Sequence, residues 1–183
     1  MKVLELFSGV GGYHIALRTL FPGIRLDVRA YDNNQTALQT YELNLDATVQ
    51  KANIEHLRGN DVDGFDLWAM SPPCQPHTNT SMSLQRDSSD KRSTPFTHIC
   101  NLLEDVLNPP EYIICENVPG FVSSAQFERF RAALRYREYD WQVCNQPAIR
   151  SLLTKLFPTY SPFLAQNIFV LCVQSAHPRQ ELS

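Results

Sequence analysis

The 183-residue sequence has no excess of positive charge, no C-x-x-C pair and no long apolar run. Its formal net charge of −3 argues weakly against an obligate nucleic-acid binder, although local basic patches matter more than the sum. Five cysteines without metal-ligand spacing predict neither a disulfide framework nor a zinc site. The sequence contains no run of about 18 apolar residues, so it predicts no membrane span. These absences favour one globular domain in a reducing compartment, the cytoplasm, the nucleus or both.

Apolar runs alternate along the chain with segments of helical periodicity. The expected strands are 2–7, 25–32, 48–54, 64–70, 111–118 and 167–173, and the expected helices are 13–21, 35–45, 96–107 and 126–137. This alternation predicts an α/β fold with a largely parallel sheet. The polar segment 77–95 is long for a connection, and it is as readily a solvated loop as a functional one.

Unusual residues fall at the predicted carboxyl ends of the strands, where parallel sheets bind their ligands. The glycines of FSGVGG follow the first strand, and each of the next four strands ends near one distinctive residue, in order Asp32, Asn53, Cys74 and Glu116. Five features of one kind at one edge predict a ligand site there.

The glycine-rich segment FSGVGG (7–12) predicts a tight turn with close approach of a ligand to the backbone. Because His14 stands at the third glycine position of G-x-G-x-x-G, a dehydrogenase is disfavoured. Asp32 follows Gly12 by twenty residues, a place suited to binding ribose hydroxyls. The pair predicts a nucleoside cofactor without a diphosphate, of which S-adenosylmethionine is the common example. The alternative is a tight turn beside a solvated aspartate.

Cys74 stands among prolines in SPPCQP (71–76), which hold it on a stiff, non-helical turn. Alone, Cys74 is more often an inert core residue and Glu116 a surface acid. Together they predict covalent catalysis with an acid partner. A thiolate that adds to carbon 6 of cytosine makes carbon 5 nucleophilic, and a carboxylic acid at ring nitrogen 3 stabilises that adduct. A base must leave its stack to reach such a site, and Arg86 and Arg92 are candidates for contacts to phosphates.

The segments LELFSGVGG, MSPPCQP and ENVPGF resemble, in this order, the cofactor, nucleophile and acid motifs of the cytosine-5 methyltransferase family. The match spans roughly residues 2–140. Glu5 and the pair Met70-Ser71 are most similar to the branch that methylates tRNA with a DNA-methylase fold. The resemblance implies a class I S-adenosylmethionine-dependent methyltransferase, Rossmann-like with helices on both faces of the sheet. It also implies a monomer that acts on nucleic acid, tRNA rather than DNA, and not on a membrane.

The resemblance also assigns roles to individual residues. It implies that Cys74 is the nucleophile and that Glu116 contacts ring nitrogen 3 and the exocyclic amine, buttressed by Asn117 and Val118. The residues implied to bind the cofactor are Phe7, Val10, Gly11, Gly12, Asp32, Asn53, Ile54 and Ser71. The residues expected on the substrate side are Pro73 and Asn117, together with Arg86 and Arg92, which the charge of the polar segment 77–95 suggests.

Other parts of the chain depart from the family pattern. The Arg-x-Arg pair that usually precedes a late strand corresponds here to Ala165 and Asn167. We expect one catalytic domain over residues 1–183, without a target-recognition domain and without the last helix that returns to the cofactor pocket. Two alternatives stay open: a DNA cytosine-5 methyltransferase, and a catalytically inactive remnant that binds the cofactor or nucleic acid.

Overall fold

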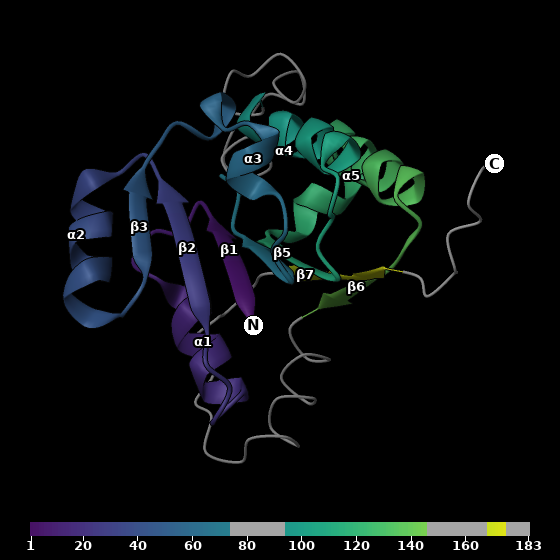
Figure 1. The fold of residues 1–183 in the computed structure, drawn as a ribbon. Helices are drawn as coiled ribbons and strands as arrows, with labels where there is room; N and C mark the ends of the chain where they lie inside the picture. Colours follow the sequence, from purple (N-terminus) through teal and green to yellow (C-terminus); the bar gives the residue numbers. More distant parts are fainter. Residues whose placement is uncertain (74–93, 146–167, 175–183) are drawn as a thin grey trace.

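The computed structural model describes residues 1–73, 94–145 and 168–174, whose ribbon is drawn in Figure 1. Within these residues one sheet of seven strands has the order β3-β2-β1-β4-β5-β7-β6. The strands are β1 Lys2–Leu6, β2 Asp27–Asp32, β3 Thr48–Lys51, β4 Leu67–Met70, β5 Tyr112–Asn117, β6 Tyr139–Asn145 and β7 Ile168–Gln174. The first five strands are parallel, and β7 runs antiparallel to both of its neighbours.

Helices connect the parallel strands. They are α1 Gly12–Leu20, α2 Gln35–Asn44, α3 Gly59–Val62, α4 Thr94–Asp105 and α5 Ala125–Tyr136, with the 3-10 turns η1 Ile54–His56 and η4 Pro119–Ser123. Local chemistry sets where they begin. The Asn34 side chain accepts from the amides of Thr36 and Ala37 at α2, and the Ser124 hydroxyl accepts from Phe127 at α5.

Strand β1 shows why helices cover both faces of the sheet. Its side chains alternate, since successive residues of a strand point to opposite faces. Val3 packs with Leu17 of α1, whereas Leu4 and Leu6 join the larger core that holds Phe96 of α4 and Phe130 of α5. Figure 1 shows α1 and α2 apart from the group α3, α4 and α5. The predicted α/β fold with a mostly parallel sheet is confirmed.

The sequence analysis did not expect the short helix α3, and it missed one strand, β6. Its side chains alternate, with Tyr139 buried and Asp140 exposed, but it follows α5 without a glycine or proline to mark the change. Glu138 makes the turn instead, with φ at 59°, a left-handed conformation that glycine usually supplies. Among the described residues, no helix has the length and apolar character needed to cross a membrane.

Arg137, just after α5, closes the end of the neighbouring helix α4. Its Nε donates to the carbonyl of Leu103 at 2.8 Å, and its Nη2 donates to the carbonyls of Glu104, at 2.7 Å, and Val106. The last carbonyl groups of a helix have no partner within the helix. The guanidinium therefore both caps α4 and fixes it against α5.

We expect Arg137→Ala to lower the free energy of unfolding by about 2 kcal/mol, because three partly buried carbonyl groups lose their donor together. Urea denaturation measures the loss. Arg135→Ala, at an exposed position of α5, is the matched control and should change stability by less than about 0.5 kcal/mol. Equal stabilities for the two variants would contradict the capping role.

Candidate cofactor and catalytic site

The register of the parallel strands brings the predicted site residues to one edge of the sheet. Leu6 of β1 is paired with Tyr31 of β2 and with Met70 of β4, and Met70 is paired with Cys115 of β5. The residues that follow these four are therefore level with one another: Phe7, Asp32, Ser71 and Glu116. The carboxyl edge thus unites three candidate cofactor residues with the candidate acid, and Glu116 is half-buried there.

The glycine turn, residues 7–12, leads from β1 into α1. Phe7, Gly9 and Gly11 all have positive φ, at 55°, 53° and 90°. The amide of Gly9 donates to Oδ2 of Asp32 at 2.8 Å, and the amide of Asn34 donates to Oδ1 at the same distance. Asp32 thus clamps the turn with one oxygen and the start of α2 with the other. Each oxygen keeps a second lone pair, so the carboxylate can still accept from a ligand hydroxyl.

The glycines of this turn face different surroundings. A Cβ atom on Gly11 would lie 2.5 Å from Cδ1 of Leu45 and 2.8 Å from Cε2 of Tyr41, so Gly11 packs directly on α2 and the residue after it. A Cβ atom on Gly9 or Gly12 would meet nothing within 4 Å. Val10, between them, is 54% exposed. The turn is therefore closed toward α2 and open beside Gly9 and Gly12, where a ligand can approach the backbone.

A buried polar network lies beneath the glycine turn. The carboxyl group of Glu5 is 1% exposed and accepts from the Tyr41 hydroxyl at 2.6 Å and from the amide of Tyr13 at 3.2 Å. The Tyr41 hydroxyl also lies 3.2 Å from Nδ1 of His14. Burial raises the pKa of Glu5 to about 7, although its hydrogen bonds partly oppose the shift. The sequence analysis gave Glu5 no role in the site.

The prolines that precede Cys74 are tied to the strand that carries Glu116. Asn117 is 3% exposed, and its Nδ2 donates to the carbonyl of Pro72 at 3.4 Å. Its Oδ1 accepts from the amide of Val118 at 2.8 Å. Pro73 is exposed. Asn117, the residue after Glu116, therefore connects β5 with the turn that leads to Cys74.

The remaining predicted residues are divided between the rim, the core and segments outside the description. Asn53 is exposed and its Oδ1 accepts from the amide of Glu55 at 3.4 Å, whereas Ile54 is buried in the main core. Cys74, Arg86 and Arg92 lie outside the described residues. The expected pairing of Cys74 with Glu116 therefore stays a prediction.

The carboxyl edge fits a nucleoside cofactor in three respects. The Ser8 hydroxyl is buried in the glycine turn without a hydrogen-bond partner among the described residues. The backbone is open beside Gly9 and Gly12, and Asp32 has acceptor capacity to spare. A buried hydroxyl of this kind usually has a partner, so its lack of one here suits a site that a ligand completes.

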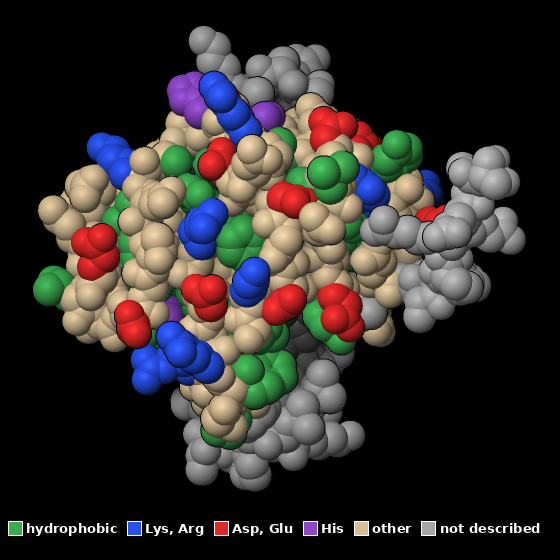
Figure 2. All heavy atoms as spheres, viewed as in Figure 1, with side chains coloured by type: hydrophobic (Ala, Val, Ile, Leu, Met, Phe, Trp, Pro, Cys, Tyr) green, Lys and Arg blue, Asp and Glu red, His purple; other side chains and the backbone are tan. Residues whose placement is uncertain are grey.

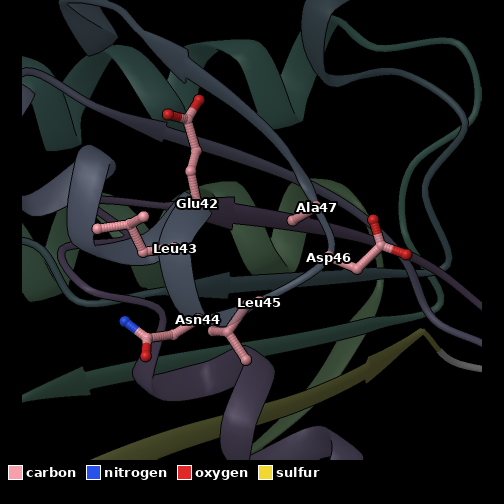
Figure 3. Close-up of a pocket in the computed structure, with 6 residues that line it drawn as sticks. All are labelled: Glu42, Leu43, Asn44, Leu45, Asp46 and Ala47. Carbon is pink, nitrogen blue, oxygen red and sulfur yellow. The ribbon is translucent and has the colours of Figure 1, made fainter.

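A hollow of about 450 Å³ lies elsewhere, where α2 passes into β3. It is lined by residues 42–47, which include Glu42 and Asp46. Figure 3 shows the side chains that line it spreading outward rather than converging. This hollow adjoins the amino end of β3, so it is separate from the carboxyl-edge site.

The glycine turn yields a stability prediction. We expect Gly11→Ala to lower the free energy of unfolding by about 2–4 kcal/mol, because the new methyl group overlaps Leu45 and Tyr41 at a positive φ. Gly12→Ala is the matched control in the first position of α1 and should stay within about 1 kcal/mol of wild type. Thermal and urea unfolding measure both. A destabilised Gly12→Ala with a tolerated Gly11→Ala would overturn this description of the turn.

Glu5 yields a prediction about pH. Its folded-state pKa of about 7 exceeds its ordinary value of 4.5, so the folded chain holds a proton that the unfolded chain has lost. The contribution to stability is therefore full below about pH 4.5 and declines as pH rises toward 7. Between pH 5 and pH 8 the wild type should lose about 2–3 kcal/mol relative to Glu5→Gln, whose amide can serve Tyr13 and Tyr41 without charge.

Urea denaturation at several pH values tests this difference. Glu42→Gln, which changes an exposed glutamate of α2, is the control and should follow the wild-type pH dependence. Parallel curves for wild type and Glu5→Gln would show that the buried carboxyl does not titrate in this range.

Comparisons with known proteins extend the description. The family model for C-5 cytosine-specific DNA methylase matches residues 1–146. The tRNA (cytosine(38)-C(5))-methyltransferase of Schizosaccharomyces pombe is 43% identical over 143 residues, which are 76% of this chain and 42% of the relative. The Homo sapiens protein of the same name is 41% identical over 196 residues, covering 98% of this chain and 49% of the relative. This chain thus spans less than half the length of either relative.

Solved structures agree with this relationship. The Entamoeba histolytica methyltransferase EhMeth aligns with a TM-score of 0.81 and 26% identity, over 96% of this chain and 53% of that one. The expected Rossmann-like methyltransferase fold is thereby confirmed. With a family model that matches most of its length and a related solved structure that superimposes on its sheet, this chain belongs to the C-5 cytosine-specific DNA methylase family.

Proposed function

We propose that this chain carries the cofactor-binding and catalytic part of a tRNA cytosine-5 methyltransferase that uses S-adenosylmethionine. The observation that carries the proposal is the level placement of Phe7, Asp32, Ser71 and Glu116 at one edge of the sheet, with Cys74 three residues beyond Ser71. Similarity to two proteins named for cytosine 38 of tRNA supports RNA as the substrate class.

The cofactor would be held by residues of the glycine turn and of the neighbouring strand ends. Asp32 would accept from the ribose hydroxyls, and the buried Ser8 hydroxyl and the open backbone at Gly9 and Gly12 would face its polar part. The other residues proposed to line it are Phe7, Val10, Gly11, Asn53, Ile54 and Ser71. S-adenosylmethionine supplies an electrophilic methyl group, which carbon 5 of cytosine is too weak a nucleophile to accept unaided.

The chain's own groups would activate that carbon. The Cys74 thiolate forms a bond to carbon 6, and the electron pair displaced from the ring double bond makes carbon 5 nucleophilic. Glu116 holds a proton at ring nitrogen 3, which stabilises the adduct. After carbon 5 has been methylated, a base from solvent removes its proton, that electron pair re-forms the double bond between carbons 5 and 6, and the bond between sulfur and carbon 6 breaks to release the thiolate. Pro72, held by Asn117, and Pro73 after it would restrict the direction in which Cys74 points.

A second candidate is methylation of DNA, which the name of the matching family model favours. A third is a remnant that binds the cofactor but has lost catalysis. The replacement of the Arg-x-Arg pair by Ala165 and Asn167 favours this third candidate. On the face that Figure 2 presents, Lys and Arg are interspersed with Asp and Glu, so the charge of that face does not separate the candidates.

A covalent trap tests the function. We expect the chain, with S-adenosylmethionine, to form an adduct with tRNA that contains 5-fluorocytosine, because fluorine cannot leave carbon 5 as a proton does. Intact-mass spectrometry measures the adduct, and Cys74→Ala should abolish it. Duplex DNA with the same base is tested in parallel, and an adduct with DNA alone would reject the RNA substrate.

Glu116→Gln is the companion variant. It should bind S-adenosylhomocysteine with unchanged affinity by calorimetry, yet slow methylation at least about 100-fold, since a group that stabilises charge in a transition state has been removed. Cofactor binding without an adduct on either nucleic acid would favour the inactive remnant. Loss of cofactor binding in this variant would contradict the role given to Glu116.

A further inference from the structure

Tyr13 joins two parts of the carboxyl edge that are far apart in the sequence. It is the second residue of α1, and its amide donates to Oε1 of Glu5 on β1. Its hydroxyl donates to the carbonyl of Met70, the last residue of β4, at 3.2 Å. One side chain therefore extends from the end of the glycine turn to the point where β4 leaves the sheet.

The hydroxyl of Tyr13 is also close to the residues that follow β4. The Ser71 side chain and the charges of Cys115 and Glu116 all act on the pKa of this phenol. Burial raises the pKa of Tyr13 well above its ordinary value, so the phenol stays protonated and able to donate. Its donor role therefore persists across the pH range in which proteins function.

The segment Ser71–Pro73, which we name the β4 exit, has few other strong attachments among the described residues. The amide of Ser71 donates to the carbonyl of Leu6 at 3.4 Å, and Asn117 donates to the carbonyl of Pro72 at 3.4 Å. Both distances are at the long, weak end of the hydrogen-bond range. Pro72 and Pro73 have no amide hydrogen to contribute. The bond from the Tyr13 hydroxyl to Met70, the residue just before this segment, is thus one of the few side-chain attachments near the β4 exit.

We propose that Tyr13 is a positioning residue that couples the glycine turn to the β4 exit, so that a ligand ordering the turn also orders Ser71. The inference rests on the proposed function, because it takes the glycine turn as the cofactor site. It goes beyond that function because it makes the Tyr13 phenol responsible for the relative placement of the glycine turn and the β4 exit. Reacting groups must be held within about 0.5 Å of their productive arrangement, so such a connection has catalytic value.

Hydrogen exchange of the Ser71 amide, measured by NMR on the 183-residue chain, tests the coupling. In the wild type, S-adenosylhomocysteine should slow this exchange. In Tyr13→Phe the ligand-free exchange should be about three- to tenfold faster, as expected for the loss of one hydrogen bond, and the ligand should slow it less than in the wild type, because only its direct contact with Ser71 remains. Affinity for S-adenosylhomocysteine, measured by calorimetry, should stay within about threefold of wild type.

A control variant and a control amide distinguish coupling through Tyr13 from a general loss of stability. Tyr136→Phe, at an exposed position of α5, should leave the exchange of Ser71 unchanged. The amide of Ala30 in β2 should exchange equally in wild type and Tyr13→Phe, and a comparable rise at Ala30 would reduce Tyr13 to a purely structural role. Unchanged exchange at Ser71 in Tyr13→Phe would overturn the proposal. If the wild type binds no S-adenosylhomocysteine, the proposal that S-adenosylmethionine is the cofactor fails. The exchange rates of Ser71 in ligand-free wild type and Tyr13→Phe still decide whether Tyr13 holds the β4 exit.

Discussion

The carboxyl group of Glu5 lies on the face of β1 that α1 and α2 cover, where it has almost no contact with solvent. An acid in such a place costs several kcal/mol unless donors reach it. The Tyr41 hydroxyl and the Tyr13 amide supply those donors, which requires α2 and the start of α1 to meet at this point. The close packing of Gly11 on Tyr41 follows from the same arrangement. The glycine turn is therefore shaped from beneath by the protein itself.

The same few contacts carry that shape across the sheet. Asp32 binds the glycine turn from the β2 side, and Tyr13 binds Met70 on the β4 side. Asn117 then connects β5 to Pro72. Four neighbouring strand ends are thus joined by side chains as well as by the backbone register. These contacts hold the residues of the carboxyl edge in a fixed relation although each strand contributes only one or two of them.

Local patterns were sufficient to predict most of the elements and the residues at the strand ends. Asp32 and Glu116 were identified because a parallel sheet brings its carboxyl ends to one edge, and the register bears out that placement. Strand β6 was missed because Glu138, and not a glycine, makes the preceding turn. The bond between Glu5 and Tyr41 spans 36 residues of sequence and has no local signature. The acid Glu5 within the apolar run KVLELF was the only feature of the sequence that indicated a buried hydrogen-bond partner.

Strand β7 has a consequence for how the protein is made. It is the last of the described strands in the sequence, yet it lies between β5 and β6 and bonds to both. Until residues 168–174 have emerged from the ribosome, β5 and β6 have no partner along these edges, and their backbone groups are open to pairing with other chains. Completion of the sheet during translation therefore depends on a segment synthesised after all the other described strands, and a nascent chain halted before it would be prone to aggregate.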